Sequence, residues 1–191
     1  MRRISPLSIA LFVLMMPCFS AAQDAKPDQP ANTIAQVLNT SVTRIQHLYG
    51  PLADIMPEDK YGFAPNNGDF KGVRTFGEQL KHVAAANFLY ASTILGEKSP
   101  QEIGEHGAGP ASVKTKAEIV RYLNDSFEYV QKALGTINDK NIVAPIKNPF
   151  GEGTATRLSM TTLIIGHCFD HYGQMVEYLR MNQIVPPASQ R

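Results

Sequence analysis

Hydrophobic residues recur at intervals of three and four along four segments of the chain, which is the spacing of one helical face. In the first segment these residues are Ile34, Val37, Leu38, Val42, Ile45, Leu48, Tyr49 and Leu52. Gly50 and Pro51 lie near the end of this segment and predict a kink or a stop, with residues 52–56 as a further turn.

The second segment is predicted to begin at Thr75 and to end at Gly96. Its apolar line comprises Phe76, Leu80, Val83, Tyr90 and Ile94. A third helix begins at Thr115, where Thr115 and Glu118 have the spacing of a capping box, and it ends at Gly135. The fourth runs from about Ser159 to Asn182, before Pro186 and Pro187 forbid its continuation.

Long polar loops rich in Gly and Pro join these helices at 57–74, 96–114 and 136–156. No segment shows a convincing alternation of apolar and polar residues that would indicate a strand. The pattern therefore predicts an all-α fold, a four-helix bundle with long loops, over residues 33–187, followed by a tail at 188–191.

The first 22 residues have the features of a secretory signal peptide. Arg2 and Arg3 are followed by the apolar run IALFVLMM and by small residues before Gln23. We expect cleavage after Ala22, a flexible leader at 23–32, and export to the periplasm or beyond the cell. The apolar run is too short for a membrane anchor, so no membrane association is expected after cleavage.

The composition argues against a nucleic-acid partner and against an internal disulfide. The signal peptide carries two of the 18 Lys and Arg residues, so its removal leaves 16 basic against 17 acidic residues and no basic patch for nucleic acid. Cys168 is the only cysteine after cleavage, so no internal disulfide can form. A buried, inert thiol is the favoured interpretation of Cys168, with a nucleophile or a fourth metal ligand as the alternative.

Two histidines, His167 and His171, lie four residues apart in the fourth predicted helix. On a helical projection both fall within the apolar arc, about 6 Å apart along the axis. Imidazoles at this spacing can share one cation. The alternative is a pair of core histidines, each satisfied by a hydrogen bond.

A metal site needs a further ligand, and His82 is the best candidate because it lies at the rim of the apolar face of the second helix. His47 falls on the polar side of the first helix, and His106 lies in a Gly-rich loop without a fixed direction. By elimination the predicted ligands are His82, His167 and His171.

Three other metal sites fit the sequence poorly. A zincin peptidase has Glu after the first histidine, where this chain has Cys168. A di-iron bundle needs Glu-x-x-His motifs, whereas here Gln79 precedes His82. The Cys-x-x-Cys-His motif of c-type haem attachment does not occur in the sequence.

Four segments resemble the DinB-like superfamily of metalloenzymes. They are LADIMPEDKYGFAP, FGEQLKHVAAANFL, GTATRLSM and GHCFDHYGQMVEYLRMNQIVPP, and the resemblance extends over about residues 34–187. It implies a four-helix bundle with a divalent metal, and by position it implies the same three histidine ligands. Tyr172 is a departure, because arginine is common there in that family.

The resemblance also implies a candidate function, metal-dependent transfer or isomerisation that uses a low-molecular-weight thiol. Such thiols are mainly cytoplasmic, so the expected export favours a second hypothesis, metal-assisted hydrolysis of a small molecule. Zinc is the expected ion, with nickel, iron and copper as alternatives. A bundle that binds metal without turnover and a bundle without metal remain open, and no catalytic residue is assigned. Asp170 and Gln174 are candidates for orienting a ligand ring, with placement on the surface as the favoured interpretation of Asp170. Gly173, inside a helix, suggests close approach of another helix, in one interpretation that of a second copy in a homodimer.

Overall fold

The computed structural model describes residues 32–65 and 72–190, which belong to one compact unit, Asn32–Arg191. The predicted signal peptide (1–22) and the predicted leader, except for Asn32, lie outside the described residues. Four long helices make up most of the unit: α1 (Ile34–Ile55), α2 (Phe76–Leu95), α3 (Lys116–Leu134) and α4 (Arg157–Met181). The predicted all-α fold is thus confirmed.

Shorter elements lie between and after these helices. They are the 3₁₀ turns η1 (Glu58–Lys60), η2 (Glu105–Gly107) and η3 (Pro187–Ser189), and the strands β1 (Pro145–Lys147) and β2 (Thr154–Thr156). The two strands pair antiparallel and form a small hairpin before α4. No helix among the described residues has both the length and the apolar character needed to cross a bilayer.

The helix starts follow from local sequence. Thr33, Thr75, Thr115 and Thr156 each precede a long helix and cap it in a reciprocal capping box. In each box the threonine hydroxyl accepts from a backbone amide that has no partner within the helix. Gly96 ends α2 in the left-handed conformation that glycine adopts without strain.

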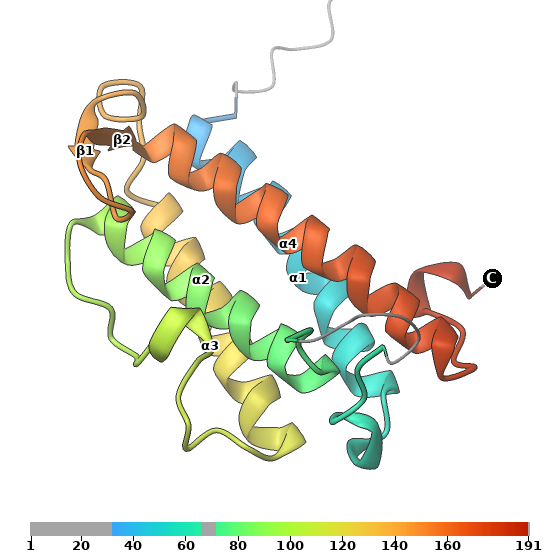
Figure 1. The fold of residues 1–191 in the computed structure, drawn as a ribbon. Helices are drawn as coiled ribbons and strands as arrows, with labels where there is room; N and C mark the ends of the chain where they lie inside the picture. The colour runs from blue at the N-terminus through green and yellow to red at the C-terminus, as the bar shows by residue number, and fades with distance from the viewer. Residues whose placement is uncertain (1–31, 66–71, 191) are drawn as a thin grey trace, which may run out of the picture. The chain divides into compact units, whose positions relative to one another are not determined.

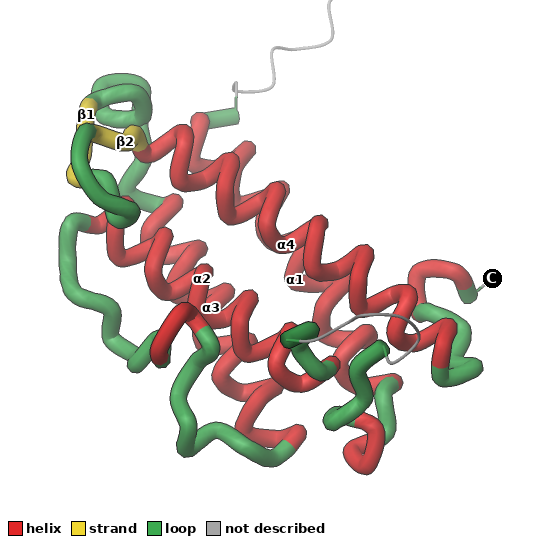
Figure 2. The backbone as a smooth tube through the Cα atoms, in the orientation of Figure 1, coloured by secondary structure: helices red, strands yellow, loops and turns green. Residues whose placement is uncertain are grey.

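The helices form a bundle in which α2 contacts α3 and α4, and α1 contacts the same two helices (Figure 1). The helices α1 and α2 are therefore diagonal to each other, as are α3 and α4. As Figure 1 shows, α1 and α4 run in one direction, and α2 and α3 run in the opposite direction. The loop from α2 to α3 consequently returns along the length of the bundle, and the β1–β2 hairpin lies at the end where α4 begins (Figure 2).

The core lies between the four helices. Its largest fully buried side chains include Tyr49, Phe76, Phe88, Phe127, Ile45, Leu52, Met56, Leu80 and Ile164. Most of these residues occupy the periodic apolar positions of the sequence, and burial of such side chains contributes about 1.5–3 kcal/mol each. Phe88 is buried as well, although it lies outside the apolar line predicted for the second helix.

Two local predictions need correction. Of the kink or stop predicted at Gly50 and Pro51, the stop is wrong, because α1 continues through Pro51 to Ile55, and the further turn predicted after it is part of the same helix. Leu52 and Ala53 are fully buried beyond the proline, and we attribute the continuation to this packing. The segment 136–156 is not wholly a loop, because β1 and β2 lie within it. Strands of three residues are too short to show an alternating pattern.

Candidate metal centre

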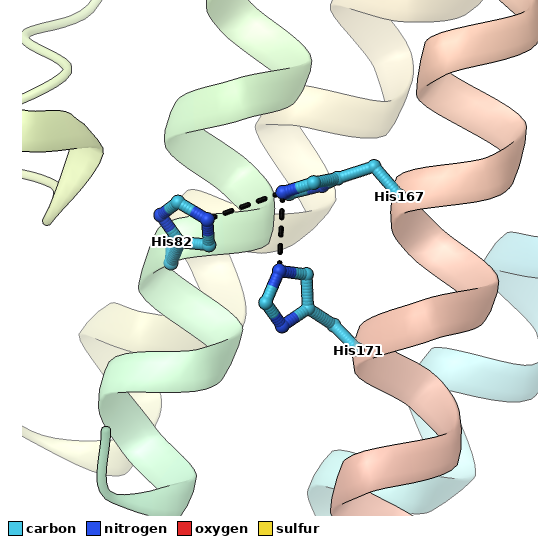
Figure 3. Close-up of side chains that lie close together, drawn as sticks. All are labelled: His82, His167 and His171. Carbon is cyan, nitrogen blue, oxygen red and sulfur yellow. Dashed lines mark hydrogen bonds between the residues drawn. The ribbon is translucent and has the colours of Figure 1, made fainter. Parts of the chain in front are cut away.

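The three predicted ligands lie together where α2 faces α4. His82 projects from α2, while His167 and His171 project from successive turns of α4 (Figure 3). The Nε2 atom of His167 lies 3.1 Å from the Nε2 atom of His82 and 3.1 Å from that of His171. Figure 3 shows the His167 ring reaching between the other two. The spatial requirement of the sequence-based hypothesis is therefore met.

The spacing of these nitrogen atoms fits a shared cation. Two nitrogens at about 2.0–2.1 Å from one zinc ion are about 3.3 Å apart in a tetrahedral site. The two separations of 3.1 Å are close to that value, and all three candidate ligand atoms lie within 4.8 Å of one another. Within residues 32–65 and 72–190, no carboxylate or thiol joins this group.

The outer nitrogen of His82 is held by a loop. Its Nδ1–H donates to the carbonyl oxygen of Gly107 at 2.8 Å. That carbonyl is brought to His82 by the segment Gly104–Gly109, in which Gly104, Gly107 and Gly109 all have positive φ. At Gly104 a Cβ atom would lie 2.1 Å from the Gly109 carbonyl oxygen, so this turn requires glycine.

The outer nitrogen of His171 is held by a side-chain amide. Its Nδ1–H donates to Gln79 Oε1 at 2.6 Å, and Gln79 Nε2 donates to Gln174 Oε1 at 2.9 Å. Gln174 in turn donates to the exposed carboxylate of Asp170 at 3.0 Å. Gln79 is buried, whereas Gln174 is only partly so.

Asp170 is exposed, as the sequence favoured, and Gln174 contacts Gln79 rather than an imidazole, so neither candidate orients a ligand ring directly. Gln79 makes this contact. Gln79 stands on α2, one turn before His82, and a search along α4 does not find it. The sequence analysis noted Gln79 only as the amide that stands where a di-iron motif has Glu. Gly107 was also missed, and three glycines within six residues were its only signal.

These outer bonds fix the tautomers of two rings. A neutral imidazole has one N–H, so donation from Nδ1 leaves Nε2 of His82 and of His171 as lone pairs. The Nδ1 atom of His167 is buried and has no hydrogen-bond partner among the described residues. No outer hydrogen bond therefore fixes the tautomer of His167, and this tautomer can change with the proton or cation that the cluster binds.

The surroundings favour the neutral form of each imidazole. Burial lowers the pKa of His167 to about 3, and the neighbouring His171 and His82 act in the same direction. Burial likewise lowers the pKa of His171 to about 4, with His82 and Arg74 contributing. The pKa of His82 is also lowered, chiefly by burial, against the opposing bond to Gly107. Neutral rings keep lone pairs available for a cation near neutral pH.

The two remaining histidines lie elsewhere. His47 is exposed on α1, and His106 is exposed in η2 with Glu105 as its neighbour at 3.4 Å. Both positions agree with the sequence-based assignment. Neither histidine belongs to the cluster.

Cys168 is fully buried, and its thiol lies 3.6 Å from Asn87 Oδ1. Burial raises the pKa of this thiol to about 12, which disfavours the thiolate needed for nucleophilic attack or metal binding. Tyr172 packs its ring 5.9 Å from that of Tyr49. Gly173 is exposed with nothing within 4 Å of an added Cβ, so the expected close approach of a helix is not found among the residues that the structure describes.

These features define a class: a four-helix bundle whose second and fourth helices carry a three-imidazole cluster. A model of the DinB superfamily matches residues 41–175, and the chain belongs to that superfamily. The family resemblance noted in the sequence is therefore confirmed.

A solved structure is similar over most of the chain. It is the crystal structure of a DinB-like protein from Bacillus cereus ATCC 10987, which is 19% identical and has a TM-score of 0.61. The similarity covers 81% of this chain and 96% of that chain. It supports the bundle fold. No curated protein matches the chain.

Proposed function

We propose that His82, His167 and His171 bind one divalent cation, zinc in the first place, with nickel, iron or copper as alternatives. The observation that carries this proposal is the convergence of the three Nε2 atoms, two of them with lone pairs fixed by outer hydrogen bonds. Converging lone pairs repel one another unless a cation or a proton lies between them. The low pKa of His167, about 3, disfavours a proton that would charge this ring at neutral pH.

We propose further that the protein is a metal-dependent enzyme acting on a small molecule. Three histidine ligands leave a coordination position for water or substrate, as in catalytic zinc sites. A divalent ion so held acts as a Lewis acid and lowers the pKa of water that it binds. His82 and His167 are only partly buried, which supports access of a small molecule to the cluster.

The other residues of the site orient the ligand rings or contribute charge near them, and we assign none of them a chemical step. Gln79 and the Gly107 carbonyl keep two imidazoles in the ligating tautomer. Arg74 places positive charge near the cluster, since it lowers the pKa of His82, His167 and His171. This charge favours a substrate with an anionic group near the metal.

Hydrolysis of a small molecule is the preferred reaction, and thiol-dependent transfer is the second. We base this order on export, which we propose from the signal-peptide features of residues 1–22. Low-molecular-weight thiols are mainly cytoplasmic, whereas water is available in every compartment. Cell fractionation and N-terminal sequencing of the mature protein test the export.

The central experiment measures metal content in freshly purified protein. We expect about one equivalent of a divalent metal, and its loss in each of the variants His82→Ala, His167→Ala and His171→Ala. His47→Ala is the matched control, because His47 is exposed and lies outside the cluster. Metal retained by all three variants, or no binding of added zinc by the wild-type protein, contradicts the site.

The alternative function is a metal-binding bundle without turnover, in which the ion only joins α2 to α4. Screens of the metal-loaded protein with hydrolase and thiol-transfer substrates distinguish the two. If His82→Ala melts the fold and the metal of the wild type binds no exchangeable water, the structural role is favoured. Turnover that disappears with the metal favours the enzyme.

A further inference from the structure

A cavity lies at the hairpin end of the bundle, away from the histidine cluster. Its lining residues belong to the C-terminal half of α2, to β1 and the loop after it, and to the first residue of α4, and its volume is about 590 Å³. We call it the hairpin cavity. Its lining includes Leu89, Ile146, Pro149, Lys147, Arg157 and Glu97.

The charges around the hairpin cavity are unbalanced. Among the described residues, neither Arg157 nor Lys147 has a carboxylate within ion-pair distance. Glu97 is the opposing charge, but its carboxylate already accepts from the Tyr129 hydroxyl at 2.8 Å and from Lys132 Nζ at 3.3 Å. The cavity thus presents two cations without local compensation.

The side chain and the backbone of Arg157 are both held in place. Its Nη1 donates to the carbonyl oxygen of Asn141 at 3.3 Å, and its backbone is the first residue of α4. Its Nε is buried and has no hydrogen-bond partner in the part of the chain that the structure describes. A buried guanidinium N–H without an acceptor costs about 1–3 kcal/mol, and the charge of this guanidinium has no anionic partner among the described residues.

The remaining walls are partly apolar, through Leu89, Ile146 and Pro149. We propose that the hairpin cavity binds a small organic anion, whose carboxylate or phosphate contacts Arg157 and Lys147 and whose short apolar chain packs against these three residues. Arginine binds both kinds of oxyanion through paired N–H groups.

This site is distinct from the metal centre but lies along the same face of α2. Leu89 and Thr93, which both line the hairpin cavity, stand on the helical face that carries His82. At a rise of 1.5 Å per residue they are about 10 and 16 Å further along the helix. Phe150, in the hairpin loop, lies 5.9 Å from the ring of Tyr90, and Tyr90 lies 6.0 Å from that of His167.

The test uses hexanoate, hexyl phosphate and uncharged hexanol as probes of the full mature protein. Binding is followed by amide chemical shifts, with titration to obtain the dissociation constant. We expect shifts in α2 near Leu89 and in β1 for the two anions, and little binding of hexanol. The stronger of the two anions identifies the preferred head group.

Lys147→Gln is the informative variant, because Lys147 is exposed and its replacement leaves the core intact. It should weaken anion binding roughly tenfold, as should Arg157→Gln. Lys114→Gln is the control, since Lys114 is exposed and does not line the cavity. His82→Ala should leave hexanoate binding unchanged, which separates this site from the metal centre.

Several results would overturn the proposal. They are an absence of anion-dependent shifts near the cavity, equal binding of hexanol and hexanoate, and equal weakening by Lys147→Gln and Lys114→Gln. Binding that requires His82 would place the anion at the metal centre instead, and would also overturn it.

Discussion

The two sides of α2 differ in the kind of contact that they make with the neighbouring helices. Toward α3 the contacts are aromatic and apolar: the Phe88 ring lies 5.2 Å from that of Tyr122 and 5.6 Å from that of Tyr129. A polar contact on this side joins Asn87 Nδ2 to Ser126 Oγ, at 3.2 Å. Toward α4 the same helix presents His82 and Gln79 to His167, His171 and Gln174.

The difference shows how one helix supports both stability and a site. Apolar contacts on the α2–α3 side supply free energy that depends little on geometry. Converging imidazoles on the α2–α4 side add little without a cation, and they need their outer bonds to stay in place. We infer that the apolar α2–α3 interface holds α2 in place. The imidazole of α2 then stays near the two imidazoles of α4, although their lone pairs repel one another.

The largest effect is expected from Phe88→Ala, at the α2–α3 interface. Phe88 is fully buried, so the variant should lose about 3–5 kcal/mol of the free energy of unfolding. Urea denaturation measures it. Phe169→Ala is the control, because that residue is half exposed on α4 and its loss should change stability by about 0.5 kcal/mol or less.

Folded Phe88→Ala protein should keep the metal stoichiometry of the wild type. If this variant loses the metal while remaining folded, the separation of the two sides of α2 is wrong.

Gln79→Ala tests the opposite side of α2. Removing the amide leaves His171 Nδ1–H without its acceptor, and zinc affinity should fall about 10–100-fold. Competition with a chelator measures the affinity. Gln46→Ala is a matched control, because Gln46 pairs with Gln131 between α1 and α3, away from the cluster. Unchanged affinity in Gln79→Ala would show that the Gln79 bond does not orient the ring.

A smaller effect should appear when metal-free protein is acidified. Burial lowers the pKa of His167 to about 3 and that of His171 to about 4, whereas an unfolded histidine titrates near pH 6.5. Below about pH 6.5 the unfolded state therefore binds protons that the folded state does not. The resulting stability is fully present above that pH and is lost as the pH falls toward 4.

Urea denaturation of chelator-treated protein at pH values of about 7 and 5 detects this loss. In the double variant His167→Asn with His171→Asn, the decrease between the two pH values should be smaller. An equal decrease in both proteins would assign the acid sensitivity to other groups.

The smallest change is expected from Gly173→Ala, on the exposed face of α4. Nothing lies within 4 Å of an added Cβ, and alanine is favoured over glycine within a helix by about 1 kcal/mol. The variant should therefore be stabilised by a similar amount in thermal unfolding. A loss of stability, with a dimer that dissociates in sedimentation, would indicate that a second copy packs on this glycine.

Much of the bundle could be predicted because its signals are local. Thr75, Thr115 and Gly96 mark helix ends through bonds to residues a few positions away, and the structure places them as predicted. The stop suggested by Gly50 and Pro51 does not occur, because the packing of Leu52 and Ala53 is a tertiary effect, which no local signal carries. The β1–β2 hairpin was missed for a related reason, since its strands depend on pairing with each other.

The sequence by itself determined four amphipathic helices and the three histidines that can face one another, because helical periodicity assigns each side chain to a face. Tertiary structure alone decided that the three Nε2 atoms meet, and that Gln79 and the Gly107 carbonyl hold their rings. These partners lie 25 and 92 residues from the histidines they contact. Such hydrogen bonds depend on atomic positions, which periodicity cannot supply.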